Sequence, residues 1–171
     1  MAEEKQVALF IGRFQPFHKG HLLALQWIAR RAGKIIIVVG SAQSKNEARN
    51  PLSARERIMA MKEELRSDGL LGKCELIPVT DLPSDRLWVG HIDAHVPGYD
   101  VVYSNNALVR KLMKRAGKEV KNVPFFKRES YNATKIRSRM REGKGWAAAV
   151  PRKVKGILVK LHAEERIMKM G

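Results

Sequence analysis

The apolar residues of the chain form short continuous runs that alternate with stretches in which they recur every three or four positions. Residues 7–11 and 35–39 are continuous apolar runs, which is typical of strands covered on both faces of a parallel sheet. Between them, residues 21–32 have apolar side chains at helical spacing, and we expect Gly33 to end this helix. Strand, helix and strand within about forty residues predict a βαβ unit.

The same alternation continues to the end of the chain. Ser53 and Glu56 have the spacing of a capping box and predict a helix through Leu65, whose arginines, Arg55 and Arg57, we expect to be solvated. The later elements are expected as a strand at 74–79, a short helix from Leu87, a strand at 101–103, a basic helix at 107–116, a strand at 119–123, a helix at 132–141 and one or two amphipathic helices over 150–168. This order predicts an α/β fold with a doubly wound, mostly parallel five-stranded sheet and C-terminal helices.

A length of 171 residues suits one domain, 1–171, with a C-terminal helical part from about residue 132. The apolar runs are too short to span a membrane, and the first residues lack the basic start and apolar run of a signal peptide. Cys74 is the single cysteine, so no internal disulfide can form. We therefore expect a cytoplasmic protein.

The net charge of +16 is concentrated in the C-terminal part of the chain. Residues 1–100 carry 14 Lys and Arg against 12 Asp and Glu, or +2, whereas residues 101–171 carry 19 against 5, or +14. Such an excess can bind the phosphates of RNA or DNA, and it can equally draw a small polyanion such as ATP into a cleft. Charge alone therefore leaves both functions open.

Candidate phosphate ligands are concentrated in residues 12–21, GRFQPFHKGH, between the first strand and the first helix. A helix N-terminus presents unpaired N–H groups that attract phosphate. Arg13, His18 and His21 add side-chain donors, and Gly20 has no side chain to obstruct a triphosphate. The stretch predicts a nucleotide phosphate site.

The spacing of this stretch excludes the Walker loop and the dinucleotide-binding fingerprint. It matches instead the [HT]xGH signature of the nucleotidyltransferase superfamily, here His18-Lys19-Gly20-His21. The alternative is a pair of histidines that only cap a helix and have no catalytic role. The neighbouring Gly and Arg residues make this alternative less favoured.

A second polar cluster lies in residues 131–137, YNATKIR. Thr134 is expected near a helix N-terminus with Arg137 about one turn further on, so that hydroxyl, N–H and guanidinium groups can meet one anion. The alternative is an ordinary capped helix with a surface arginine. His91 and His95 have the spacing of a metal pair on a helix, but no third ligand stands at motif spacing, so we expect no protein metal site.

With these motifs in order, nearly the whole chain resembles the archaeal-type nicotinamide-nucleotide adenylyltransferases. The resemblance rests on GRFQPFHKGH, on GSAQ at 40–43, on LWV at 87–89 and on TxIR at 134–137. It implies a Rossmann-like nucleotidyltransferase fold. It also implies transfer of AMP from ATP to nicotinamide mononucleotide, giving NAD and pyrophosphate, with Mg²⁺ or another divalent cation bound mainly through the ATP phosphates.

The resemblance also implies the roles of individual residues. The catalytic phosphate ligands would be His18, His21, Arg13 and Arg137. The ATP-binding residues would be Gly12, Phe14, Gly20, Gly40, Ser41, Ser104, Asn105, Asn106 and Thr134. The nicotinamide nucleotide would contact Asp81, Asp85 and Trp88, with its ring stacked on Trp88. Without the resemblance, Trp88 would more often be a core residue.

The chain departs from the family pattern in three places. Asn132-Ala133 replaces a hydroxyl-containing pair before Thr134, Asn105 stands where relatives commonly carry Gly, and Asp85 stands where Asn commonly faces the carboxamide. These changes concern affinity and the preference between nicotinamide and nicotinate mononucleotides, and they leave the expected reaction unchanged.

Two other functions remain as alternatives. An FMN or pantetheine-phosphate adenylyltransferase shares HxGH but would not be expected to carry both GSAQ and LWV. A basic RNA-binding protein would use residues 101–171, yet these contain no recognisable nucleic-acid-binding motif, and aromatic residues make up only 6% of the chain. We therefore expect no specific nucleic acid partner. By resemblance we expect a homo-oligomer, with the helices after Val150 as possible interface.

Overall fold

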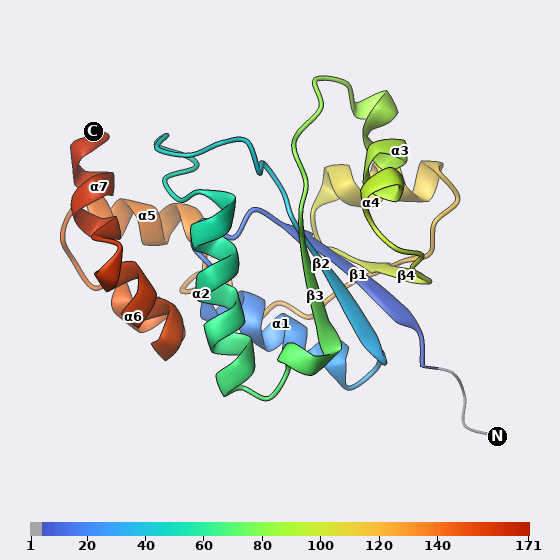
Figure 1. Ribbon diagram of the computed structural model, residues 1–171, viewed down its shortest axis with the longest axis horizontal. Helices are drawn as coiled ribbons and strands as arrows, with labels where there is room; N and C mark the ends of the chain where they lie inside the picture. Colours follow the sequence, from blue (N-terminus) through green and yellow to red (C-terminus); the bar gives the residue numbers. More distant parts are fainter. Residues whose placement is uncertain (1–4) are drawn as a thin grey trace.

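The computed structural model describes residues 5–171 and is built around a five-stranded parallel sheet in the order β3-β2-β1-β4-β5 (Figure 1). The strands are β1 Val7–Gly12, β2 Lys34–Val39, β3 Cys74–Pro78, β4 Val101–Tyr103 and β5 Val120–Lys121. The chain runs outward from β1 through β2 to β3, then returns to place β4 on the other side of β1. Such a reversal leaves a crevice at the carboxyl ends of β1 and β4, where open α/β sheets bind ligands. The doubly wound parallel sheet predicted from the sequence is confirmed.

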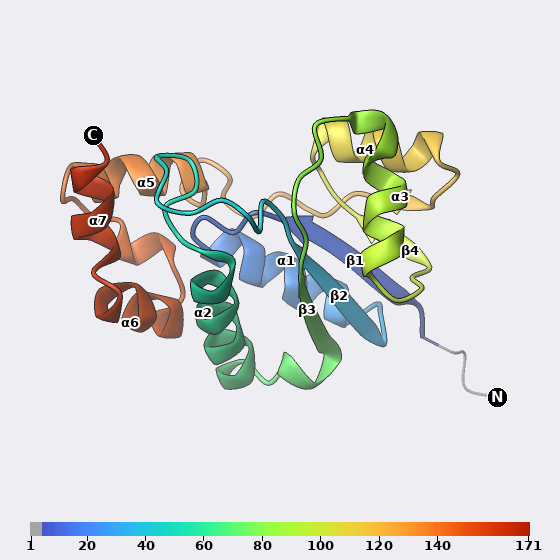
Figure 2. The same cartoon turned by 45° about the horizontal axis from the view of Figure 1, so that its top comes forward.

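Helices cover both faces of the sheet (Figures 1 and 2). One face carries α1 Lys19–Ala29 and α2 Ala54–Ser67, and the other carries α3 Asp85–His95 and α4 Ala107–Arg115. The last helices are α5 Ala133–Arg141, α6 Arg152–Lys160 and α7 Ala163–Lys169, and the short 3₁₀ turns are Leu71–Lys73 and Ala147–Ala149. The last helices lie at the end of the molecule away from α3 and α4, where α6 packs on α2 and α7 packs on α5 and α6.

The strands contribute side chains to two hydrophobic cores, because successive side chains of a strand point to opposite faces of the sheet. In β1, Phe10 faces the larger core with α1, α2 and the C-terminal helices, whereas Leu9 faces the smaller core under α3 and α4. In β2, Ile35 and Ile37 face the larger core and Ile36 the smaller one. Burial on both faces explains why these strands have no polar alternation.

The boundaries of the first helix differ from the sequence prediction. α1 begins at Lys19 because His18 caps it, and it ends at Ala29 with Arg30 as its C-cap, so the prediction that Gly33 ends it is wrong. Gly33 instead lies at the entry to β2, where its N–H donates to the Gln6 carbonyl and an added Cβ would lie 2.8 Å from the Lys5 Cβ. The requirement for Gly here is close backbone approach, not helix termination.

A buried carboxylate attaches α6 to α2. Pro151 is the N-cap of α6, and it has no side-chain acceptor for the helix N–H groups. Glu64 of α2 supplies one, because its Oε2 accepts from the Lys153 N–H at 2.7 Å.

None of the helices within residues 5–171 is long and apolar enough to cross a lipid bilayer.

Candidate active site

The two histidines of the HxGH stretch cap α1 reciprocally. The His21 N–H donates to the Nδ1 of His18 at 3.3 Å, and the His18 N–H donates to the Nδ1 of His21 at 3.2 Å. The rings stack with centroids 3.5 Å apart. Since both Nδ1 atoms accept, each neutral ring carries its proton on Nε2, which is left to donate to a ligand.

The surroundings of both rings favour the neutral form. Burial lowers the pKa of His18 to about 4. Burial, and then the neighbouring His18, lowers the pKa of His21 well below its ordinary value. At neutral pH the pair therefore offers hydrogen bonds without positive charge, and the arginines must supply the charge.

Gly20 is required by the close packing around this pair. A Cβ at position 20 would lie 3.0 Å from the His18 ring and 3.1 Å from the Cβ of Tyr131. A side chain here would push against the ring of His18, in addition to the expected obstruction of a triphosphate. The glycine of the motif therefore protects the histidine geometry.

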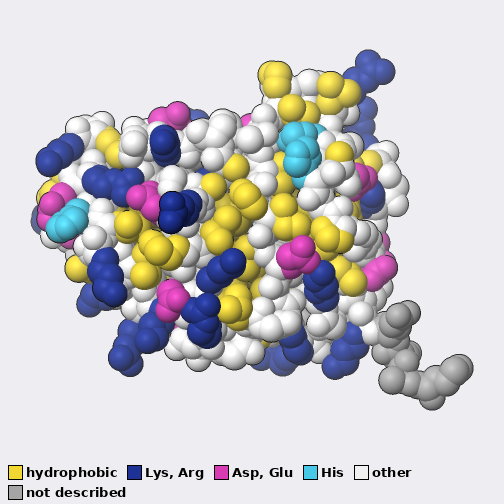
Figure 3. Space-filling model, viewed as in Figure 1, with side chains coloured by type: hydrophobic (Ala, Val, Ile, Leu, Met, Phe, Trp, Pro, Cys, Tyr) yellow, Lys and Arg dark blue, Asp and Glu magenta, His cyan; other side chains and the backbone are white. Residues whose placement is uncertain are grey.

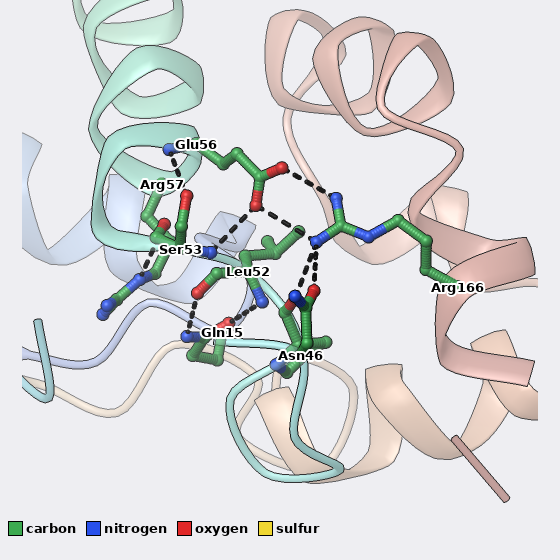
Figure 4. A network of polar contacts seen from close by, with 8 residues as sticks. Gln15, Asn46, Leu52, Ser53, Glu56, Arg57 and Arg166 are labelled. Atoms are coloured by element: carbon green, nitrogen blue, oxygen red, sulfur yellow. Dashed lines mark hydrogen bonds and ion pairs between the residues drawn. The ribbon is translucent and has the colours of Figure 1, made fainter. Parts of the chain in front are cut away.

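The loop that follows β1 is anchored from two sides. The side chain of Gln15 pairs with the backbone of Leu52, donating to its carbonyl at 2.7 Å and accepting from its N–H at 3.0 Å (Figure 4). From α5, Arg137 Nη1 donates to the Gln15 carbonyl at 2.8 Å. These contacts fix the backbone between Arg13 and the histidines.

Arg57 anchors the same loop from α2, so the prediction that it is solvated is wrong. Its side chain is buried, with Nη1 donating to the carbonyls of Arg13 at 2.6 Å and Gly40 at 2.7 Å and Nη2 donating to that of Ser41 at 3.0 Å. Burial, then the charge of Arg13, lowers the pKa of Arg57 to about 10, opposed by Asp81, so it stays charged at neutral pH. A sequence signal was available, because Arg57 precedes Met61 and Leu65 at steps of four on one helix face.

The first cavity, called here the tryptophan cavity, has a volume of about 330 Å³ and lies between β1, β2, α3 and α4. Its lining includes Ile11, Gly12, Arg13, Gly40, Ser41, Asp81, Asp85, Trp88, Asn106 and Leu108. Asp81 is fixed here because its carboxylate accepts from the Ser41 N–H at 3.2 Å and from Gln43 Nε2 at 3.1 Å. All three residues expected to bind the nicotinamide nucleotide thus line one cavity.

The second cavity, the histidine cavity, has a volume of about 320 Å³. Its lining includes Ile11, His18, Gly20, His21, Ser104, Asn105, Asn106, Phe125, Arg128 and Tyr131. Ile11 and Asn106 line both cavities, so the two adjoin at the carboxyl ends of β1 and β4. The wall formed by residues 124–131 carries no residue that the sequence analysis assigned to the site.

Three of the expected site residues line neither cavity. The Phe14 ring is 2% exposed and packs against His21 at a centroid distance of 4.9 Å, so only its backbone could reach ATP. Arg137 lies beside Thr134 as expected, with Nη2 3.4 Å from its Oγ1. Among residues 5–171, the buried Nε of Arg137 finds no hydrogen-bond partner, and burial followed by Arg13, Arg141 and Arg49 lowers its pKa.

The asparagines after β4 have structural contacts of their own. The Asn105 side chain donates to the Val123 carbonyl at 2.6 Å and accepts from its N–H at 3.0 Å, which holds the chain after β5 in place. Asn106 caps α4 by accepting from the Val109 N–H at 3.1 Å. The Asn105 side chain therefore binds the backbone of the chain after β5.

His91 and His95 make backbone contacts on α3. The Nε2 of His91 lies 3.0 Å from the Thr80 carbonyl, and the Nδ1 of His95 lies 2.7 Å from the His91 carbonyl. Within residues 5–171, no three His, Cys, Asp or Glu side chains gather into a group that could hold a metal ion.

Burial raises the pKa of the Cys74 thiol to about 11, so this cysteine is not a reactive thiolate at neutral pH.

Known proteins are similar to this chain both in sequence and in fold. Residues 9–139 match the family model described as cytidylyltransferase-like. A nicotinamide-nucleotide adenylyltransferase of Ignicoccus hospitalis is 42% identical over 166 residues, covering 96% of this chain and 97% of that protein. The enzyme of the same name from Methanolobus tindarius is 41% identical over 160 residues, covering 94% and 91%.

Among solved structures, a bifunctional NMN adenylyltransferase/ADP ribose pyrophosphatase from Francisella tularensis has a TM-score of 0.81 at 21% identity, covering 97% of this chain and 52% of that chain. A further structure of that description, complexed with AMP and a manganese ion, has a TM-score of 0.79. At this identity the likeness shows the fold, while the sequence relatives show the family. The chain belongs to the nicotinamide-nucleotide adenylyltransferase family.

Proposed function

We propose that this protein transfers AMP from ATP to nicotinamide mononucleotide, forming NAD and pyrophosphate. The observation that carries the proposal is the pair of adjoining cavities, one lined by Trp88 and two carboxylates and the other by the HxGH histidines. A reaction that joins two nucleotides needs two such neighbouring sites. The relatives of this chain at about 40% identity over nearly its whole length bear the name of this activity.

The tryptophan cavity suits the nicotinamide nucleotide. Its pyridinium ring is aromatic and positively charged, so the indole face of Trp88 offers both stacking and a cation–π contact. The carboxylates of Asp81 and Asp85 in the same lining favour a cationic ring. The neutral carboxamide can donate to a carboxylate, whereas the carboxylate of a nicotinate ring would be repelled.

The histidine cavity and the loops beside it suit ATP. The Nε2–H groups of His18 and His21 are available to phosphate oxygens, and Arg13 and Arg137 supply the positive charge. The adenosine and phosphates would contact Gly12, Gly20, Gly40, Ser41, Ser104, Asn105, Asn106 and Thr134, and the backbone of Phe14. Arg137 is buried and lines neither cavity, so it would act on the phosphates through its charge and through its contact with the Gln15 carbonyl.

The reaction needs alignment and charge stabilisation more than a general base. The 5′-phosphate of the mononucleotide, with a second pKa of about 6, is already a dianion at neutral pH. One of its oxygens attacks the α-phosphorus of ATP while the bond from that phosphorus to the bridging oxygen breaks, so that pyrophosphate leaves with the electron pair. His18, His21, Arg13 and Arg137 stabilise the charge that develops on the phosphoryl oxygens.

The divalent cation belongs to the substrate in this proposal. We propose that Mg²⁺ arrives with the ATP phosphates, because the residues of the two cavities form no group of carboxylates or histidines that could hold a metal. Assembly into a homo-oligomer and action in the cytoplasm stay predictions.

An acceptor panel tests the proposed function. The protein is incubated with MgATP and, separately, nicotinamide mononucleotide, nicotinate mononucleotide, FMN and pantetheine phosphate, and pyrophosphate release is followed. We expect fastest release with nicotinamide mononucleotide. Release with another acceptor class and none with either pyridine nucleotide would overturn the assignment.

A further inference from the structure

We propose that Arg57 is a positioning residue for adenylyl transfer, fixing the loop after β1 relative to the loop after β2. The inference rests on the proposed function, because it assigns Arg57 a part in that reaction. Arg57 touches neither cavity and acts through Arg13, Gly40 and Ser41, which line the tryptophan cavity.

The guanidinium group joins two segments that only the fold brings together. Arg13 directly follows β1, and Gly40 and Ser41 directly follow β2. One nitrogen, Nη1, binds both the Arg13 and the Gly40 carbonyls, while Nη2 binds that of Ser41. The Nε of Arg57 also donates to the Ser53 carbonyl at 3.3 Å, which fixes the guanidinium group relative to the start of α2 (Figure 4). A planar fork with several donors can make these bonds at once, and a lysine ammonium cannot reproduce them.

Ser41 connects the guanidinium group of Arg57 to the carboxylate of Asp81. Its φ of 48° lies in the left-handed region, a strained conformation that a non-glycine residue keeps only where its neighbours hold it. Arg57 holds the Ser41 carbonyl and Asp81 accepts from the Ser41 N–H. Release of the fork would therefore move Arg13, Ser41 and Asp81 together.

The acceptors of Arg57 are all neutral. Its hydrogen bonds among the described residues go to the backbone carbonyls of Arg13, Gly40, Ser41 and Ser53, and no salt bridge joins it to a carboxylate. A buried charge that served only stability would be expected to have an acidic partner. A fixed positive charge beneath Arg13 suits a site that must receive the phosphates of two nucleotides.

Three variants separate positioning from a merely structural role. Arg57→Met removes the fork and the charge, Arg57→Lys keeps the charge without the fork, and Arg55→Met is the matched control, an exposed arginine on the same helix. For each folded variant, the kcat, the KM for both nucleotides and the hydrogen exchange of the Ser41 and Ala42 amides are measured well below the unfolding temperature. A structural role would change the unfolding temperature and leave the kcat of the folded enzyme unchanged.

We expect kcat to fall by a factor on the order of 10² in Arg57→Met and about tenfold in Arg57→Lys, with smaller changes in KM, because a shift of about 1 Å in the aligning groups has effects of this size. The Ser41 and Ala42 amides should exchange faster in both, and Arg55→Met should match the wild type. A folded Arg57→Met enzyme with a kcat within about threefold of wild type overturns the inference. If Arg57→Met does not fold, wild-type kcat in Arg57→Lys overturns it.

A wild-type protein that releases no pyrophosphate with either pyridine nucleotide would defeat the proposed function instead. The hydrogen exchange of the Ser41 and Ala42 amides would then still show whether Arg57 holds the loop after β2. Unchanged exchange in Arg57→Lys and Arg57→Met would overturn the inference on its own.

Discussion

At the scale of single residues, the same imidazole rings cap a helix and line the histidine cavity. Each Nδ1 of His18 and His21 accepts a backbone N–H, which leaves each Nε2–H as the donor. Protonation of Nδ1 would remove an acceptor from the capping box, in addition to placing charge in a buried site. The cap therefore selects the neutral tautomer that the proposed reaction needs.

A nuclear magnetic resonance titration of the histidine rings tests this tautomer. We expect a midpoint of about 4 for His18 and one well below the ordinary value for His21, with ¹⁵N shifts of the Nε2–H form near neutral pH. Because the unfolded chain takes up these protons near pH 6.5, the stability that the neutral rings contribute is complete above that pH and falls as pH drops toward 4. A histidine peptide in the same sample is the control. A midpoint between 6 and 7 for either ring would contradict the assignment.

Substitution of His18 separates its two roles. His18→Ala should lose the cap, costing about 1 kcal/mol of stability, and should also lose turnover. His18→Asn keeps a side-chain oxygen that can cap α1, so its unfolding temperature should stay near that of wild type while turnover still falls by a factor on the order of 10² to 10³. Wild-type turnover in a folded His18→Asn enzyme would show that the ring has only a structural role.

Turnover should fall by a similar factor of about 10² to 10³ in Arg13→Ala and His21→Ala, with less effect on nucleotide binding. Arg13 is the cleaner test, because its exposed side chain is not needed for the backbone contact to Arg57. Steady-state kinetics of the folded variants give the comparison. A loss confined to the KM for ATP would assign Arg13 to ground-state binding instead.

Trp88→Ala should show the opposite balance. The KM for nicotinamide mononucleotide should rise through lost stacking while ATP affinity stays nearly unchanged, because the ring is bound before and during reaction alike. Trp88 also packs against the smaller core, so circular dichroism must first show that the variant is folded. An unchanged KM in a folded Trp88→Ala enzyme would place the nicotinamide ring elsewhere.

At the scale of elements, the sequence predicts the strands well and some boundaries poorly. The apolar runs identify β1 and β2 because burial on both faces leaves no polar position to break them. The N-terminus of α1 is missed because histidine is not a preferred capping residue, and here two histidines cap each other. The fifth strand shrinks from 119–123 to Val120–Lys121, since the Asn105 side chain, not a strand, pairs with Val123.

The attachment of α7 to the loop before α2 could not be read from spacing, because the partners are more than a hundred positions apart. Arg166 donates to the Glu56 carboxylate at 2.8 Å, to Asn46 Oδ1 at 3.1 Å and to the Pro51 carbonyl at 2.9 Å (Figure 4). Glu56 also completes the capping box of α2 with Ser53. The C-terminal helix thus holds the segment that leads from Ser41 to α2.

Arg166→Met should therefore lower the free energy of unfolding by about 1 to 3 kcal/mol, because it leaves a half-buried carboxylate without its partner. For a protein of this size that is roughly 2–4 °C in unfolding temperature for each kcal/mol. Arg152→Met, at an exposed position of α6, is the control. Equal unfolding temperatures for the two variants would contradict this account of the contact.

At the scale of the whole molecule, the candidate site gathers residues from β1, β2, α3 and the chain after β4. The HxGH signature could be found in the sequence because its residues are neighbours. The grouping of Asp81, Asp85 and Trp88 came from the family resemblance, and no spacing rule predicts which cavity they line. The spacing of Arg57 to Met61 and Leu65 could have indicated that Arg57 is buried, but its partners could not be predicted, because they are backbone carbonyls that no residue type identifies.

The charge of +16 does not by itself indicate a nucleic acid partner. On the face shown in Figure 3, Lys and Arg side chains are scattered over α2 and the C-terminal helices and are separated by uncharged atoms. Binding to RNA stays an alternative that salt dependence can test, since phosphate contacts weaken steeply as salt rises. Salt-sensitive RNA binding that survives saturating ATP and nicotinamide mononucleotide would favour it.

The fate of the α-phosphorus of ATP tests the central claim most directly. The protein is incubated with Mg²⁺, nicotinamide mononucleotide and ATP labelled at the α-phosphorus, and the products are separated. Direct transfer of AMP predicts that the label appears in NAD, with unlabelled pyrophosphate and no label retained on the protein. Label bound covalently to the protein, or label absent from the dinucleotide, would contradict direct adenylyl transfer at this site.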